Sequence, residues 1–269
     1  MPGILPNLSM EEALELTKIY SISGKLDSGF ITSRPVRSPH HTTSNIALVG
    51  GGTNPRPGEI TLSHRGILFL DEFPEFPRNV LEALRQPLED GVVTVARASG
   101  SFTFPAKFTL VAAQNPCPCG FLGDASKKCI CAPGQIFKYQ KKISGPLLDR
   151  IDLHVEVPRL PYEKISNTES AEESANIKLR VEKARQIQRQ RFSMSKTNSE
   201  MSLVELKEHC RLGEKEQQIL KQAMKQYNFS GRSLHRILKV ARTIADLSGE
   251  NLVLVHHLAE AIQYRPKTE

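Results

Sequence analysis

The stretch GILFLDE, residues 66–72, constrains the fold of this chain more than any other part of its sequence. Four consecutive apolar residues run directly into two adjacent carboxylates, Asp71 and Glu72. A short, uninterrupted apolar run is typical of a strand that is buried on both faces of a parallel sheet. Acids that follow such a strand lie at the carboxyl edge of the sheet, where open α/β sheets bind their ligands. The stretch therefore predicts an α/β fold with two carboxylates at its binding edge.

A carboxylate pair at this place has two interpretations. In phosphoryl transfer, one carboxylate holds Mg²⁺, usually through water, and the other orients or polarises the attacking water. The simpler interpretation is that Asp71 and Glu72 only lead the strand into the turn at Phe73-Pro74. The stretch alone favours the simpler interpretation, and the elements that follow it along the chain reverse that preference.

A second apolar run, residues 108–113, predicts another buried strand. It ends at Gln114-Asn115. A polar amide at the end of a strand next to an acid-tipped strand can orient a water or a γ-phosphate. Taken alone, the same amide is an ordinary cap of a strand end.

Arg150 precedes a third predicted strand. Residues 151–157 alternate apolar and polar side chains, which indicates a half-buried strand. Arg150 has two possible roles there. It either pairs with Asp149 or Asp152, or it reaches a phosphate held by a neighbouring subunit as an arginine finger.

Local signals predict the helices around these strands. Ser9 and Glu12 form a capping box that begins a helix extending to Tyr20. Pro77 suits the first turn of another helix, and Pro87 is predicted to end it.

Residues 92–104 contain two short β-prone runs and predict a hairpin. Its tip carries Arg97. This arginine either touches a polymer threaded through a ring or is simply solvated.

A polar linker at residues 158–168 separates an α/β core, residues 1–159, from an all-helical domain, residues 160–269. We predict helices in the second domain over residues 169–192, 203–210, 214–227, 232–247 and 255–264. Arg232 and Arg236 are four residues apart, so they share one side of the fourth helix near its N-terminus. That side lies away from the apolar stripe of the helix.

The composition is that of a soluble globular protein, with 39% hydrophobic and 24% charged residues in a chain of 269. No apolar run approaches the length of a membrane span. Residues 1–6 lack the basic and then apolar pattern of a signal peptide, so we expect a cytoplasmic protein. Trp is absent, which argues against aromatic stacking as the main binding device.

The net charge is +7, and most of the excess lies in the C-terminal part. Residues 1–159 hold 17 basic and 15 acidic residues, whereas residues 160–269 hold 19 and 14. This excess permits contact with nucleic acid. A solvated basic helical face explains the charge equally well.

Four of the five cysteines fall within fifteen residues, at Cys117, Cys119, Cys129 and Cys131. In a cytosolic chain such a cluster indicates metal or redox chemistry before structural disulfides. Two C-x-C pairs can place four thiolates around one tetrahedral Zn²⁺, although the spacing differs from the common C-x₂-C knuckle. The alternative is four reduced thiols in a loop.

His40 and His41 are adjacent, in the segment RPVRSPHHTTS of residues 34–44. They are candidate ligands or catalysts. No third ligand stands at a fixed spacing from them, so hydrogen-bonding roles are favoured.

This ordered set of motifs resembles the AAA+ ATPase superfamily, within it the magnesium-chelatase-like group, and most closely the ComM/YifB family. The segments that carry the resemblance are RPVRSPHHTTS, GGGTNPRPGEITLSHRGILFLDE, LRQPLEDG, AAQNPCPCG, SGPLLDRIDLHVEVP and HRILKVARTIADL. They span essentially the whole chain. The resemblance implies an incomplete AAA+ P-loop NTPase core, with a parallel sheet, helices and a β-hairpin insertion, followed by an all-α lid.

The resemblance also implies roles for residues of the core. Asp71 and Glu72 match the Walker B acids, of which the first assists Mg²⁺ and the second activates water. Asn115 matches the sensor-1 polar residue. The hairpin of residues 92–104 matches the insertion that faces the central channel of a ring.

Three arginines receive roles in the same way. Arg150 matches the arginine finger, which acts on ATP held by the adjacent subunit. Arg232 matches the sensor-2 arginine of the helical lid, and Arg236 is the alternative for that role. The family is associated with hexameric motors that act on DNA in recombination, including natural transformation. Insertion of magnesium into a porphyrin is not expected.

The phosphate-binding loop of this superfamily, G-x-x-x-x-G-K-[ST], does not occur in the sequence. We therefore expect the chain to resemble the C-terminal part of a longer protein and to bind Mg-ATP weakly or not at all by itself, unless another chain supplies that loop. The alternative function is a zinc-stabilised basic fragment that binds DNA or a partner protein without catalysis.

Overall fold

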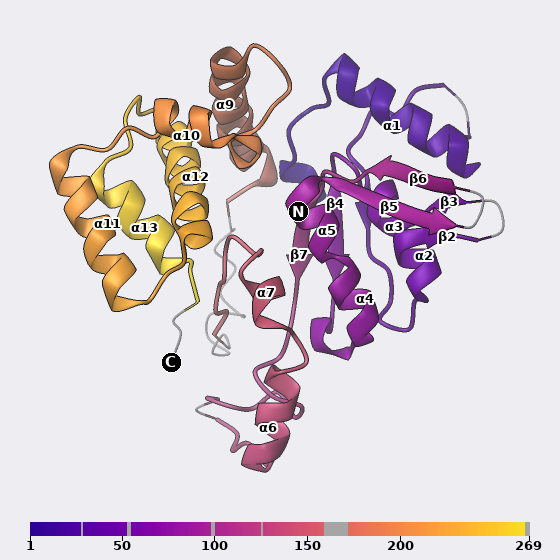
Figure 1. Ribbon diagram of the computed structural model, residues 1–269, viewed down its shortest axis with the longest axis horizontal. Coiled ribbons are helices and arrows are strands. Elements are labelled where there is room, and N and C mark those ends of the chain that lie inside the picture. The colour runs from indigo at the N-terminus through magenta and orange to yellow at the C-terminus, as the bar shows by residue number, and fades with distance from the viewer. Residues whose placement is uncertain (28, 53–54, 98–99, 125, 159–171, 267–269) are drawn as a thin grey trace. The chain divides into compact units, whose positions relative to one another are not determined.

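The computed structural model describes residues 1–27, 29–52, 55–97, 100–124, 126–158 and 172–266. The chain divides into two compact units (Figure 1). The sheet unit is Leu8–Arg150, and the helical unit consists of Met1–Asn7 together with Ile151–Glu269. The domain boundary predicted between residues 159 and 160 lies outside the described residues.

The sheet unit is a series of short strands and helices. In chain order they are α1 (Met10–Ser23), β1 (Val36–Arg37), α2 (Asn45–Val49), β2 (Gly50–Gly51), β3 (Arg56–Pro57), α3 (Glu59–Leu62), β4 (Ile67–Leu70), η2 (Phe73–Glu75), α4 (Arg78–Ala83), α5 (Arg85–Asp90), β5 (Val92–Arg97), β6 (Gly100–Pro105), β7 (Thr109–Ala112), α6 (Pro133–Gln140) and α7 (Gly145–Leu148). The predicted hairpin is confirmed, because β5 and β6 pair in antiparallel fashion.

Three parallel strands form the main sheet, in the order β1-β4-β7. The GILFLDE run supplies the central strand, and its residues Leu68 and Leu70 are fully buried, as predicted. Gly66 precedes this strand at a point where a side chain has no room, because a Cβ there would lie 1.9 Å from the carbonyl oxygen of Pro35. Glycine therefore allows the backbone to approach closely enough for the amide of Ile67 to bind that same oxygen.

The second predicted strand is present as β7, but the prediction that it is buried is wrong. Its four residues are exposed or half-buried. The reason is its place in the sheet: within the described residues, β7 has β4 on one side and no strand on the other.

Two helix boundaries show how local signals act. The capping box of Ser9 and Glu12 is present at the start of α1, as predicted. Pro87 does not end a helix, which corrects the prediction. The helical path breaks at Leu84, and Pro87 lies in the first turn of α5, where no intrahelical partner for its missing N–H is needed.

The strand predicted over residues 151–157 is not formed. The segment is described without any strand pairing, and Leu153, Val155 and Val157 are 50%, 66% and 86% exposed. The alternating pattern shows which side chains share a face, but a strand also needs a neighbour to accept its backbone hydrogen bonds.

A buried histidine links three parts of the sheet unit. The backbone N–H of Lys107 donates to Nδ1 of His64 (3.0 Å), and Nε2 of His64 lies 3.1 Å from a carboxylate oxygen of Glu15. Nδ1 is therefore unprotonated, and the ring donates through Nε2. Burial lowers the pKa of His64, although Glu15 opposes that shift.

This pKa makes the stability of the sheet unit sensitive to acid. The unfolded histidine protonates near pH 6.5 and the folded one at lower pH, so the stabilisation is complete above about pH 6.5 and is lost as the pH falls from there through the folded pKa. We expect thermal unfolding followed by circular dichroism to show lower stability at pH 5 than at pH 7.5. His64→Gln should reduce that difference, whereas His40→Gln, at an exposed position, should not. Equal pH dependence in the wild type and His64→Gln would contradict the assignment.

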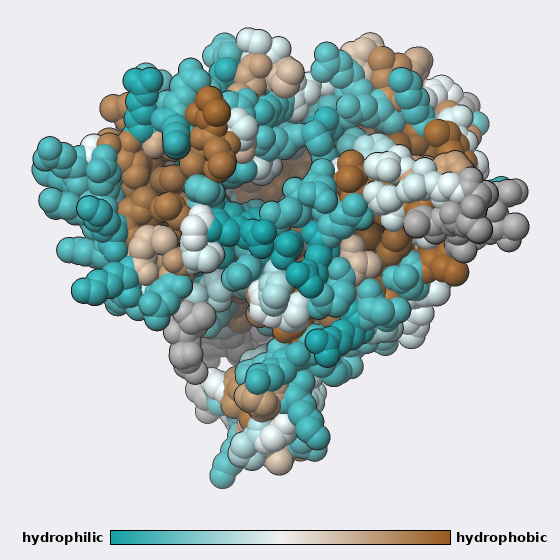
Figure 2. Space-filling view, viewed as in Figure 1, coloured by the Kyte–Doolittle hydropathy of each residue, from teal (hydrophilic) through white to brown (hydrophobic). Residues whose placement is uncertain are grey.

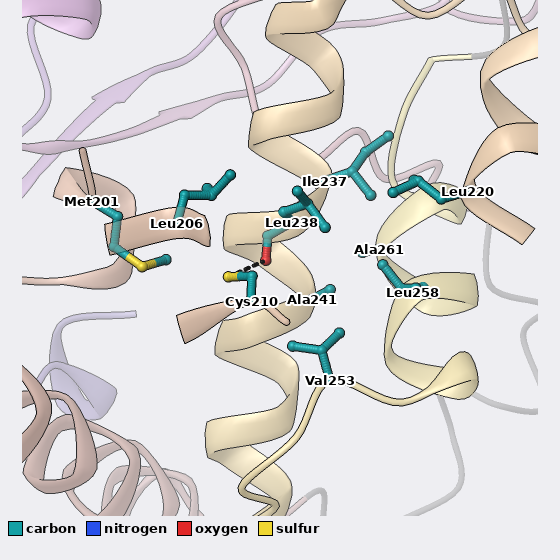
Figure 3. Packing of buried hydrophobic residues seen from close by; sticks show 10 residues of the cluster. All are labelled: Met201, Leu206, Cys210, Leu220, Ile237, Leu238, Ala241, Val253, Leu258 and Ala261. Atoms are coloured by element: carbon teal, nitrogen blue, oxygen red, sulfur yellow. Dashed lines mark hydrogen bonds between the residues drawn. The ribbon is translucent and has the colours of Figure 1, made fainter. Parts of the chain in front are cut away.

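The helical unit contains η1 (Pro2–Ile4), α9 (Ser174–Phe192), η3 (Asn198–Glu200), α10 (Leu203–His209), α11 (Glu214–Gln226), α12 (Gly231–Ser248) and α13 (Val255–Gln263). Helix α12 is its centre. Figure 3 shows Ile237 and Ala241 of this helix, both fully buried, between residues of α10 on one side and of α13 on the other. Ser230 caps α12 by accepting from the N–H of Ser233. None of the described helices is long and apolar enough to cross a membrane.

A buried carboxylate ties α12 to two other elements of this unit. The Asp246 side chain is 0% exposed and forms ion pairs with Arg191 of α9 and with Arg242 one turn earlier in α12. The amide of Asn198 in η3 donates to the same carboxylate (2.7 Å). Arg242 also donates to the carbonyl oxygens of Glu250 and Asn251. Each buried charge thus has a partner, which burial requires.

Candidate functional site

Polar residues follow all three parallel strands at their carboxyl ends. His41 comes after β1, the two predicted acids after β4, and Asn115 after β7. The pairing of β4 and β7 continues past the strand ends, because the N–H of Phe73 donates to the carbonyl of Ala113 (2.9 Å). The acids and the segment that leads to Asn115 therefore leave the sheet side by side, as expected for one site.

Both predicted acids are exposed at this edge. Asp71 accepts a hydrogen bond from the backbone N–H of Glu72 (2.8 Å). Glu72 has a left-handed backbone, with φ 51° and ψ 44°, which is uncommon for residues other than glycine and recurs at functional sites. Its side chain is 56% exposed. The carboxylates are thus available to a ligand and are not sealed in the core.

His41 contacts one of these acids, with its Nδ1 2.9 Å from a carboxylate oxygen of Glu72. Its ring also lies against those of His40 and Phe76, while Nδ1 of His40 lies 2.9 Å from the hydroxyl of Thr42. The predicted hydrogen-bonding roles are confirmed, but the partner of His41 was not predicted. The contact could have been predicted only from the topology, because His41 and Glu72 follow neighbouring parallel strands.

Asn115 is exposed, and its side-chain amide makes no hydrogen bond to a described residue. Next to it lies Tyr139 of α6. Burial raises the pKa of this tyrosine, and the carboxylates of Glu75 and Glu72 act in the same direction, while the backbone of Asn115 opposes them. Tyr139 therefore belongs to the surroundings of the acid pair, which the sequence did not indicate.

Arg150 lies in the sheet unit, but neither predicted pairing is the one observed. Its Nε is 3.0 Å from a carboxylate oxygen of Glu89, and an Nη donates to the carbonyl of Pro146 (2.6 Å). The side chain is only 10% exposed. Asp152, one of the two predicted partners, instead pairs with Arg236 (2.6 Å). The role of Arg150 as an arginine finger stays a prediction.

The two candidate lid arginines lie at the start of α12 in the helical unit. Arg232 is exposed, and Arg236 is held by Asp152 with its side chain 17% exposed. Arg236 thus has a structural partner within its own unit, and Arg232 is the more exposed of the two. Both roles stay predictions.

The four clustered cysteines converge on one point of the sheet unit. Their sulfur atoms all lie within 4.8 Å of one another. The distances from Cys117 to Cys119 and Cys129 are 3.4 and 3.7 Å, and Cys119 and Cys129 are 3.6 Å apart. Four sulfurs at about 2.3 Å from a tetrahedral zinc are about 3.8 Å from one another, so the cluster has nearly the size of such a site.

The ionisation of the cluster also suits a cation. Backbone N–H groups of Phe121 and Ile130 lower the pKa of Cys119 to about 6. Cys129 behaves in the opposite way: the backbone of Cys131 lowers its pKa, but desolvation and the neighbouring sulfurs raise it to about 12. One thiolate therefore hinders the ionisation of the next. A divalent metal bound to all four sulfurs would offset the repulsion between the thiolates.

Comparison with known families covers nearly the whole chain. Residues 1–165 match the family described as "Magnesium chelatase, subunit ChlI", and residues 171–265 match "Magnesium chelatase, subunit ChlI C-terminal". The chain thus consists of a magnesium-chelatase-like AAA+ domain followed by a helical C-terminal domain, in agreement with the predicted fold class.

Curated relatives match at high identity. The chain is 45% identical to "Competence protein ComM" of Haemophilus influenzae over 267 residues, 43% identical to "Uncharacterized protein YifB" of Escherichia coli over 266, and 41% identical to "Uncharacterized protein Rv2897c" of Mycobacterium tuberculosis over 270. Each match covers 98% of this chain but only 52%, 52% and 53% of the relative, so the chain spans about half the length of these proteins. The chain therefore belongs to the ComM/YifB family of magnesium-chelatase-like AAA+ proteins.

Proposed function

We propose that the chain supplies the acid-bearing part of an ATPase site in a ring-shaped motor that acts on DNA. The observation that carries the proposal is the exposed pair of Asp71 and Glu72 at the end of the central strand, beside the strand end that leads to Asn115. The name of the relative "Competence protein ComM" supports a role in competence, and hence in recombination of incoming DNA. A cytoplasmic location goes with this role.

In this proposal each residue at the sheet edge has one task. Bound Mg²⁺ would neutralise charge on the phosphates of ATP, and Asp71 would hold it through water. Glu72 would orient the attacking water, with His41 as its hydrogen-bond partner. Asn115 would contact the water or the γ-phosphate with its unengaged amide. Arg150 would act on the ATP of an adjacent subunit, which requires it to leave Glu89.

In this proposal, the glycine-rich loop that binds the phosphates of ATP must come from another polypeptide. The motif G-x-x-x-x-G-K-[ST] is not found between residues 1 and 269, and its backbone amides and lysine supply most contacts to the phosphates. We therefore expect weak binding of Mg-ATP by this chain alone. A polypeptide that carries the motif, assembled with this chain in a ring, would complete the site.

The test is reconstitution with such a polypeptide. Mixing it with this chain should produce ATP hydrolysis that DNA stimulates, and Glu72→Gln should lower the rate about 10²-fold or more, because positioning of the water is lost while phosphate contacts remain. Phosphate release measures the rate. Glu75→Gln is the matched control, since Glu75 is an exposed acid three residues away that pairs with Lys142, and it should stay near wild type. Undiminished hydrolysis in the Glu72→Gln mixture would show that the assigned role is wrong.

A second function is favoured by the convergence of the four cysteines. In it, zinc bound by Cys117, Cys119, Cys129 and Cys131 stabilises a basic fragment that binds DNA or a partner without catalysis. Binding to DNA that weakens steeply with salt, in the absence of any ATP turnover on reconstitution, would favour this function over the first.

A further inference from the structure

The four cysteines and α6 form a projecting part of the sheet unit, which we call the cysteine lobe, residues 116–143. Figure 1 shows α6 beyond the end of β7, away from the other helices of that unit. The lobe contains five lysines, and Asp124 is its one acidic residue. A segment of one charge sign attracts the opposite sign, so the lobe is suited to an anionic partner.

Most of these lysines are uncompensated. Lys127, Lys128, Lys138 and Lys141 are all exposed, and none pairs with a carboxylate in the described part of the chain. The carboxylate of Asp124 accepts from Ser126 and from backbone N–H groups of its own turn. The fifth lysine of the lobe pairs with Glu75. Four positive charges are therefore available to a ligand.

Aromatic rings lie among these charges. The ammonium of Lys127 lies 4.1 Å from the ring centre of Phe121, and that of Lys141 lies 4.1 Å from the ring centre of Phe137. Phe137 is 57% exposed, so its ring is accessible to a ligand. Figure 2 shows a few hydrophobic residues at the surface of this part of the molecule, surrounded by hydrophilic residues. Exposed lysines next to an exposed aromatic ring are typical of surfaces that bind single-stranded nucleic acid.

The cysteine cluster connects the segment that carries Lys127 and Lys128 to helix α6, which carries Lys138 and is followed by Lys141. Lys127 and Lys128 lie between the two pairs of cysteines, and α6 begins at Pro133, two residues after Cys131. At the other end of α6, the side chain of Gln140 donates to the carbonyl of Pro116 (3.3 Å). The lysines of both segments therefore project from a common scaffold.

We propose that the cysteine lobe is a binding surface for single-stranded DNA, with the four exposed lysines on backbone phosphates and Phe137 stacked on a base. The inference rests on the proposed action on DNA, and it names the surface that performs it. A single strand fits better than a duplex, because an exposed aromatic ring can stack only on a base that is not already stacked within a duplex. Lysine ammonium groups act as point charges, so binding is independent of base sequence.

The test is binding of a fluorescein-labelled 20-mer of thymidine to the full chain, followed by anisotropy across a salt series. The variant Lys127→Ala/Lys128→Ala/Lys138→Ala/Lys141→Ala should weaken binding at least tenfold at about 0.1 M salt. It should also lower the slope of log K against log salt by about 3, since each lost phosphate contact accounts for about 0.7. Phe137→Ala should weaken binding about fivefold or more without changing that slope.

The matched control removes the same charge from elsewhere. The variant Lys207→Ala/Lys215→Ala/Lys221→Ala/Lys225→Ala changes four exposed lysines of the helical unit and should leave the slope nearly unchanged. Equal weakening by both quadruple variants would overturn the lobe as the binding surface and leave the proposed action on DNA standing. Failure of the wild type to bind the 20-mer would also overturn the lobe as the binding surface, whereas the proposed ATPase site is tested separately by the reconstituted hydrolysis. An equal effect of Phe137→Ala on duplex DNA would overturn stacking on a free base.

Discussion

Protein purified without chelator is expected to carry one zinc ion per chain, and Cys129→Ser is expected to lose it. The four sulfurs lie within 4.8 Å of one another, so little rearrangement is needed to surround a tetrahedral ion. Structural zinc contributes about 10–16 kcal/mol in small zinc-binding peptides, and removal of one thiolate sacrifices much of that. Elemental analysis measures the metal, with protein concentration from amino-acid analysis because the chain lacks Trp.

The fifth cysteine offers a matched control. Cys210 is 5% exposed in the core of the helical unit, and its Sγ lies 3.7 Å from the carbonyl of Leu238 (Figure 3). Cys210→Ser removes a buried sulfur without touching the cluster, so it should keep the full zinc content. Substoichiometric zinc in the wild type, or equal loss in both variants, would refute the zinc site.

Asp246→Asn is expected to lower the free energy of unfolding of the helical unit by about 3–5 kcal/mol. The substitution keeps the shape of the side chain but removes the charge that compensates Arg191 and Arg242. Removal of one partner from a buried ion pair leaves the other charge desolvated and unpaired, which costs more than the pair contributes. Urea unfolding followed by far-ultraviolet circular dichroism should show the loss in the transition of this unit.

An exposed ion pair of the same unit serves as the comparison. Glu172 lies 2.7 Å from Arg180, and both side chains are well exposed at 43% and 56%. Glu172→Gln should therefore cost at most about 1 kcal/mol. If Asp246→Asn costs no more than Glu172→Gln, the buried network does not hold α9, η3 and α12 together in the way its contacts indicate.

Features of the chain that have a local physical cause could be predicted from the sequence. The capping box at Ser9 needs only residues within one turn. A short continuous apolar run such as residues 67–70 can bury all of its side chains as a central strand, which is covered on both faces. The cysteine cluster was also predictable, because two C-x-C pairs within fifteen residues are close in sequence and their sulfur atoms need only a short loop to come together.

Features that depend on a partner far along the chain could not be predicted. Residues 151–157 have the alternation of a strand but no strand partner in the described structure. Arg150 has acids on either side in sequence, yet it pairs with Glu89, 61 positions earlier. Alternation and sequence proximity describe which groups are available, whereas packing decides which of them meet.

The α/β core, the helical second unit, the acid-tipped central strand and the family were all predictable from the pattern of residues alone. The contact of His41 with Glu72, the place of Tyr139 beside the acid pair, and the sharing of Asp246 by Arg191 and Arg242 became visible only in the folded chain. The reason is that hydrophobic period and capping act over a few residues, while a hydrogen bond or ion pair between distant segments exists only after the chain has brought their backbones together.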